Sequence, residues 1–191
     1  MTLPFSIGRL LLTVVIRMPN AKAVNRTGTR MVMPITGGVW QGVDSVAHFN
    51  KVKARFFSEY GFQSFPEYQS VLKYAPEERD HDIYSDVMMA HQRGGQIANS
   101  RIENITLDEY RKPKDFPSTL YMSILLQGDA MKTAMEAHRR MMPYNMGSLF
   151  WQHNDCWPVA SWSSRDYYGR WKAQHYFTKK AFRDILVSPI A

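Results

Sequence analysis

One carboxylate in this chain, that of Glu59, stands where an acid could serve as a nucleophile or in proton transfer. It ends a short aromatic run and precedes a glycine and a turn, within the stretch Arg55-Phe56-Phe57-Ser58-Glu59-Tyr60-Gly61-Phe62-Gln63-Ser64-Phe65-Pro66. A strand over this run would carry Arg55, Phe57 and Glu59 on one face. A charge among aromatic side chains needs either a chemical task or a charged partner. From residue types alone, the simpler interpretation is a carboxylate paired with a nearby arginine.

Trp151 lies 92 residues after Glu59 and belongs to a second block of aromatic and polar residues. It lies in the stretch Met146-Gly147-Ser148-Leu149-Phe150-Trp151-Gln152-His153-Asn154-Asp155-Cys156-Trp157-Pro158-Val159-Ala160-Ser161-Trp162-Ser163-Ser164. Together the two blocks resemble β-mannosidases of the family 2 glycoside hydrolases. The first is similar to the segment that carries the catalytic nucleophile, and the second to the last barrel strand and its loop. The segment from Tyr167 to Lys172 continues the resemblance, which covers about residues 38–190.

The resemblance implies a role for five side chains. Glu59 would be the nucleophile of a retaining glycosidase, at the carboxyl end of a barrel strand. Trp151 would form the floor beneath the sugar, since a rigid aromatic face suits the flat C–H face of a saccharide. Asn154, Asp155 and Trp157 would shape the loop above it and belong to the substrate-binding set. The resemblance also implies a cis peptide after Trp151.

A retaining glycosidase needs a second carboxyl group, about 5–5.5 Å from the first, as acid and base. In the family, that glutamate follows an asparagine on an earlier strand. These 191 residues contain no Asn-Glu pair, and Glu103-Asn104 has the reverse order. The resemblance therefore predicts a segment that carries the nucleophile, lacks the acid/base, and is inactive alone.

The fold class predicted for the chain is α/β, as the later portion of an incomplete (β/α)8 TIM barrel over residues 37–185. A complete barrel of this kind usually needs roughly 250 residues. The pattern predicts strands ending at Glu59 and over 148–153, separated by a long helix over 117–142. On that helix, Met131, Met135 and Met142 fall near one face, which is expected to pack against the sheet as part of the core. It also predicts helices over 43–54, 67–74 and 168–186. Residues 76–100 are predicted to form a long loop, with a helix at 85–91, that shapes the site.

The first 36 residues differ from the rest, because they hold five basic residues, no acid and no family resemblance. In the neighbouring reading frame, residues 30–37 can encode a string that the family carries there. We therefore expect residues 1–36 to be an out-of-frame, non-native leader, the alternative being a divergent N-terminus. Residues 186–191 are expected to be a truncated exit toward a following domain.

The remaining residues carry only +2 of the net charge of +7, without a basic stripe, so nucleic acid is not an expected partner. The single cysteine, Cys156, has no His or Cys at metal-ligand spacing, and neither a metal nor a cofactor is expected. No apolar run approaches the length of a membrane span, and no signal peptide is recognised. The expected partner is a β-mannoside. The sequence indicates neither the cellular compartment nor whether a longer parent enzyme forms a homodimer.

Three alternatives stay open at this point. A β-galactosidase or β-glucuronidase of family 2 would share the fold and the nucleophile, although the Gln-Ser-Phe-Pro turn and the Asn-Asp-Cys-Trp-Pro loop favour a mannosidase. A non-catalytic carbohydrate-binding module could instead use the tryptophans, but such modules are usually β-sandwiches. A gene product without a function of its own is the third interpretation.

Overall fold

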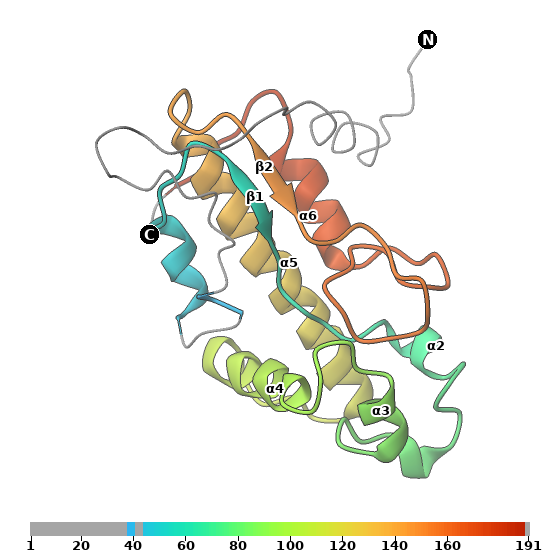
Figure 1. Ribbon diagram of the computed structural model, residues 1–191. Coiled ribbons are helices and arrows are strands. Elements are labelled where there is room, and N and C mark those ends of the chain that lie inside the picture. The colour runs from blue at the N-terminus through green and yellow to red at the C-terminus, as the bar shows by residue number, and fades with distance from the viewer. Residues whose placement is uncertain (1–37, 41–43, 190–191) are drawn as a thin grey trace.

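The computed structural model describes residues 38–40 and 44–189 (Figure 1). The expected leader over 1–36 therefore lies outside the described residues, as does the end of the expected exit segment. Helices and strands follow in this order: η1 Val46–Asn50, β1 Phe57–Tyr60, α2 Tyr68–Val71, η2 Glu78–Asp80, α3 Asp86–Ala90, α4 Ala98–Glu109, α5 Phe116–Arg140, β2 Ser148–Phe150 and α6 Ala173–Ala181.

Strands β1 and β2 form a parallel pair, joined through the long helix α5. Phe57 pairs with Ser148 and Tyr60 with Phe150. Figure 1 shows both strands running in the same direction over α5, with α6 beside it. This is the strand, helix, strand, helix order of α/β proteins, because parallel neighbours need a crossover connection. The predicted α/β class is confirmed at this level.

The predicted alternation of faces along β1 is wrong. Phe57 and Tyr60 are both buried against α5, while Glu59 is exposed. The register between β1 and β2 shifts between Phe57 and Tyr60. A bulge of this kind places two residues opposite one, so that the side chains beyond it change face. Glu59 consequently faces away from Phe57 rather than lying on its side of the strand.

Helix α5 matches its predicted position, and its start has a clear local cause. The carboxylate of Asp115 accepts a hydrogen bond from the amide of Ser118 at 2.8 Å, and Pro117 stands in the first turn. The predicted methionine face is largely correct, because Met131 and Met135 are buried. Met142 lies beyond the end of the helix and is 56% exposed, so its predicted place in the core is wrong.

Other elements differ from the sequence prediction in extent. The helix expected over 43–54 is only the 3-10 turn η1, and the one expected over 168–186 is the shorter α6. The predicted strand over 148–153 stops at Phe150. Helix α4 was not predicted, because its residues are mostly polar and no capping side chain marks its start.

A buried polar chain lies between α5 and the strands. The ring of His138 stacks on Phe57 with centroids 3.5 Å apart, and its Nδ1 shares a 2.8 Å hydrogen bond with the hydroxyl of Ser148. The Ser148 hydroxyl in turn shares a 2.8 Å hydrogen bond with the hydroxyl of Tyr60. Burial lowers the pKa of His138 to about 3, since charging a ring enclosed by aromatic and aliphatic groups is costly.

This histidine should make the fold acid-sensitive. The unfolded chain protonates a histidine near pH 6.5, whereas the folded chain resists until about pH 3, so the unfolded state binds more protons between these values. Stability should therefore fall as the pH drops from 6.5 toward 3. We expect His138→Asn to reduce the loss of unfolding free energy between pH 7 and pH 4.5 by about 2 kcal/mol, measured by urea unfolding.

The matched control is His48→Asn, because the His48 side chain is 39% exposed. It should leave the acid-dependent loss unchanged. An equal loss in wild type and His138→Asn between the two pH values would contradict the assignment of acid sensitivity to His138.

Candidate active site

Glu59 and Trp151 lie near the carboxyl ends of the two parallel strands. The amide of Trp151 donates a 2.7 Å hydrogen bond to the carbonyl of Tyr60. Tyr60 pairs with Phe150, so Glu59 and Trp151 are each one step away from this pair. Tyr60 is buried against α5 and Phe150 packs against the core, so the exposed side chains of Glu59 and Trp151 are directed away from α5. Glu59 is exposed and Trp151 is 42% exposed.

The carboxylate of Glu59 makes no ion pair and accepts no side-chain hydrogen bond within residues 38–40 and 44–189. Arg55, the arginine nearest in sequence, instead places its guanidinium over the ring of Tyr144, 5.2 Å from the centroid. The neighbouring Tyr60 is buried, which raises its pKa, and its hydroxyl contacts Ser148. Within the described residues, the simpler interpretation of an arginine-paired carboxylate is therefore not observed.

Gly61 is required where the two strand ends come together. A Cβ atom at this position would lie 2.3 Å from the carbonyl oxygen of Trp151 and 3.0 Å from the Trp162 ring. No side chain can be accommodated there without moving backbone. The Trp151–Gln152 peptide is cis, as the resemblance implied. The glycine that follows Glu59 in sequence therefore allows the chain to pass directly over the residue after β2.

Asp155 lies inside the loop that follows β2 and is only 5% exposed. Its carboxylate accepts hydrogen bonds from the Ser161 hydroxyl at 2.7 Å, the Gln152 amide at 3.0 Å and the Ser163 hydroxyl. These donors enclose the carboxylate on its own loop. Asn154, in contrast, is exposed, and its carbonyl accepts from the Gln152 amide at 3.0 Å. Of these two predicted site residues, only Asn154 has its side chain at the surface.

Trp157 is 37% exposed and rests on a histidine of the long loop. Its ring centroid is 5.8 Å from that of His91, whose other partner is Tyr74 in a stack at 4.1 Å. The Nδ1 atom of His91 is 2.6 Å from the Pro158 carbonyl. His91 therefore supports the loop after β2 by stacking and hydrogen bonding.

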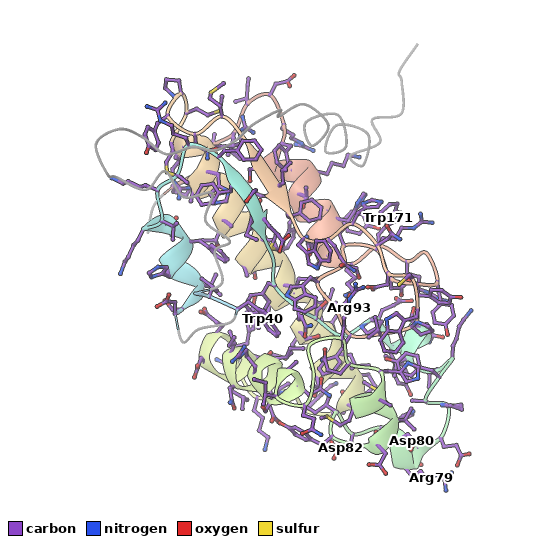
Figure 2. The ribbon with its side chains drawn as sticks, in the orientation of Figure 1. Trp40, Arg79, Asp80, Asp82, Arg93 and Trp171 are labelled. Carbon is purple, nitrogen blue, oxygen red and sulfur yellow. The ribbon has the colours of Figure 1, made fainter. Side chains whose placement is uncertain are left out.

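The long loop contacts the segment after β2 through the backbone of His91 and Arg93. The amide of Ala160 donates to the His91 carbonyl at 2.8 Å, and the amide of Arg93 to the Ala160 carbonyl at 3.1 Å. In Figure 2, Arg93 lies in the middle of the molecule, whereas Asp80 and Asp82 lie at its lower end. On the other side of the strand ends, the buried Trp40 meets Phe62 edge-on, with ring centroids 5.2 Å apart.

Two residues that hold this site together were not singled out from the sequence. Gln127 on α5 is fully buried, and its amide donates to the carbonyls of Phe62 at 2.9 Å and Ser163 at 3.2 Å. Lys172, at the start of α6, is 3% exposed and contacts Ser64. Gln127 could have been recognised in the sequence, because it is an amide on the apolar face of the predicted long helix. Nothing in the sequence marks a lysine as buried.

A search of residues 38–40 and 44–189 finds no group of three or more His, Cys, Asp or Glu side chains that could hold a metal ion. Within the same residues, none of the helices combines the length and the apolar character needed to cross a membrane.

The close approach at Gly61 gives a direct test of the strand-end geometry. We expect Gly61→Ala to lower the free energy of unfolding by about 2–3 kcal/mol in urea, because the new methyl group overlaps backbone. Gly95→Ala is the comparison: Gly95 has a φ of 79° and open space around its Cβ position, so only backbone strain of about 1 kcal/mol applies. If the two variants lost equal stability, the close approach would not be present in solution.

Comparison with known proteins gives one consistent result, although no protein-family model matches the chain. A β-mannosidase of Bos taurus is 37% identical over 152 residues, covering 70% of this chain and 16% of that protein. β-Mannosidase B of Thermothelomyces thermophilus is 32% identical over 162 residues, covering 78% and 18%. The crystal structure of a β-D-mannosidase from Dictyoglomus thermophilum has a TM-score of 0.73 and 36% identity, covering 78% and 18%.

The chain thus spans less than a fifth of the length of these relatives. The similarity lies over most of this chain, in sequence and in three-dimensional structure alike. It confirms the resemblance that the Glu59 and Trp151 blocks indicated. Over 70–78% of its length, the chain is similar in sequence and in structure to a segment of these β-mannosidases.

Proposed function

We propose that residues 37–185 are the nucleophile-bearing, later portion of the (β/α)8 barrel of a retaining exo-β-mannosidase, which removes terminal β-D-mannosyl residues. One observation carries the proposal: the exposed carboxylate of Glu59 and the exposed ring of Trp151 leave the same face of two paired parallel strands, at their carboxyl ends. Active sites of barrel enzymes are built at this end of the strands. The named relatives supply the substrate class.

The one-sided covering of the strands supports the barrel assignment. Helix α5 covers one face of β1 and β2, through Phe57, Tyr60 and His138. The opposite face, with Glu59 and Trp151, is left accessible. In a barrel, that second face points to the interior and toward the bound sugar. The strand order β1–β2 would then be two neighbouring strands of the closed sheet.

In this proposal, an oxygen of Glu59 attacks the anomeric carbon of the mannoside, and the bond from that carbon to the leaving oxygen breaks. Trp151 lies beneath the sugar ring and fixes its orientation. Trp157 and Asn154 line the loop above it. We propose that Asp155 organises this loop from within, since its carboxylate is occupied by Gln152, Ser161 and Ser163.

The leaving oxygen requires a proton, and we propose that the group that provides it is not among these 191 residues. The acids that the structure places near the strand ends are unsuited to the task. Asp155 and Asp166 are 5% and 3% exposed, and each is held by hydrogen bonds from neighbouring residues. Loss of general acid catalysis typically lowers a rate by 10² to 10⁴.

A glycosyl fluoride separates the two catalytic roles, because fluoride leaves without being protonated. We expect 2-deoxy-2-fluoro-β-D-mannosyl fluoride to label the chain once, with an ester bond to Glu59 and release of fluoride ion. Peptide mass spectrometry would locate the label. Glu59→Gln should not be labelled, whereas Glu78→Gln, which changes an exposed glutamate of η2, should be labelled at the wild-type rate. Equal labelling of Glu59→Gln would overturn the assignment.

The same reagent series distinguishes the other family 2 enzymes. The corresponding galactosyl and glucuronyl fluorides should label Glu59 at least tenfold more slowly than the mannosyl reagent. Faster labelling by either would replace the mannosidase assignment. A binding module, the remaining alternative, has no nucleophile to label, and the helices α5 and α6 with a parallel strand pair are unlike the β-sandwich of most such modules.

Ordinary substrates should behave differently from the fluoride. With an aryl β-mannoside of poor leaving-group ability, we expect no hydrolysis above the uncatalysed rate, and no difference between wild type and Glu59→Gln. The measurement is release of the aryl alcohol by the purified chain. Turnover of several per second, the ordinary range for enzymes, would show that the chain does contain a functional acid/base.

A further inference from the structure

The segment after β1 and the segment after β2 cross at a short antiparallel bridge between Ser64 and Ser161. The amide of Ser64 donates to the Ser161 carbonyl at 3.0 Å, and the amide of Ser161 to the Ser64 carbonyl at 3.1 Å. Ser64 is five residues beyond Glu59, and Ser161 lies ten residues beyond Trp151. This bridge is therefore where the chain segments that follow the two site residues are tied together.

A single ammonium group lies on this bridge. The Nζ atom of Lys172 is 3.3 Å from the Ser64 carbonyl, 3.4 Å from the Ser161 carbonyl and 3.1 Å from the Ser64 hydroxyl. Each bridge carbonyl thus accepts a second hydrogen bond in addition to the one from the opposite backbone amide. The three acceptors match the three N–H donors of a charged lysine. A neutral amine has only two, so the full set of contacts requires the charge.

Two buried carboxylates balance this charge. Burial is the larger effect and lowers the pKa of Lys172 to about 8, while Asp155 and Asp166 act in the opposite direction and raise it. Asp155 belongs to the loop after β2 and is bound to Ser161. Asp166 receives hydrogen bonds from the Ser70 hydroxyl and the Arg170 amide. A buried charge of this kind is costly unless it is paired and fully hydrogen-bonded.

Lys172 is itself fixed by the scaffold. It precedes the first turn of α6, and its amide donates to the Ser164 carbonyl at 3.0 Å. Helix α6 packs along α5, where Gly128 admits the ring of Phe177. The ammonium is therefore held by two packed helices, while the loops that it contacts belong to the proposed site.

We propose that Lys172 is a positioning residue, which holds the Glu59 segment and the Trp151 segment in the single arrangement that the reaction needs. This inference rests on the proposed function, because Lys172 touches neither Glu59 nor Trp151 and acts through Ser64 and Ser161. Its charge, rather than its bulk, provides the restraint. The alternative is that Lys172 has only a packing role and contributes to overall stability alone.

Amide hydrogen exchange in the 191-residue chain tests this without any sugar. After correction for intrinsic exchange rates, protection of the Ser64 and Ser161 amides should fall at least tenfold between pH 7 and pH 9 as Lys172 loses its proton. In Lys172→Met the protection should be low at both pH values. In Lys172→Arg, which stays charged, it should be kept at both. Lys53→Met, at an exposed lysine, should behave as wild type.

The amides of α5 are the internal reference, and they should change less than threefold throughout. Equal loss of protection in α5 and at the bridge would reduce Lys172 to a contributor to overall stability. Unchanged protection in Lys172→Met would overturn the proposal outright. If that variant does not fold, Lys172→Gln takes its place, because it keeps a polar group without the charge. Unchanged protection of the bridge amides in Lys172→Gln would exclude the role of the charge.

Labelling by the mannosyl fluoride separates this proposal from the one on which it rests. We expect Lys172→Met to be labelled at Glu59 at least tenfold more slowly than wild type, with Lys172→Arg close to wild type. Labelling that is absent in every variant, alongside the expected exchange pattern, would refute the nucleophile and leave the bridge restraint standing. Labelling at equal rates in all variants would refute the positioning role alone.

Discussion

The hydrogen bond from the Trp151 amide to the Tyr60 carbonyl, 2.7 Å long, determines how the rest of the site is arranged. It extends the parallel pairing of β1 and β2 by one step beyond β2, so that the residues on either side of the Tyr60–Phe150 pair emerge together. The same close approach requires Gly61, whose Cβ would overlap the Trp151 carbonyl. Side-chain chemistry at this end of the molecule therefore depends on a backbone contact.

Between α5 and the segments that follow β1 and β2, the buried contacts are made by polar side chains rather than by apolar ones. Gln127 reaches from α5 to the carbonyls of both strand-end segments, and the Ser64 hydroxyl donates to it at 2.9 Å. Such buried networks have few alternative arrangements, because each unmet hydrogen bond in a low-dielectric interior is costly. The loops after β1 and β2 lack regular secondary structure, yet the network gives them defined positions relative to α5 and α6.

The sequence predicted correctly those features that depend on residues close together in the chain. Asp115 and Pro117 mark the start of α5, and the spacing of its methionines indicates the buried face. The position of Trp151 beside Glu59 followed from motif resemblance, since no local pattern reports which strands pair. The bulge in β1 could not be predicted, because it depends on the register with β2. The burial of Lys172 depends on acceptors more than 100 residues earlier in the chain as well as on nearby ones, which a pattern of residue types does not encode.

In the proposed function, the two carboxyl groups of the retaining glycosidase come from different strands, so that this segment would hold only one half of the site. The surroundings of Glu59 and Trp151 are closed locally by β2, the loop after it, and the helices α5 and α6. None of these contacts requires the strand that would hold the acid/base. The surroundings of the proposed nucleophile are thus determined within the described residues, whereas the distance of about 5–5.5 Å to a second carboxyl group would be a property of the closed barrel. In the proposed function, the local geometry around Glu59 is therefore separable from catalysis by the pair of carboxyl groups, because the first is determined within the segment and the second across the whole sheet.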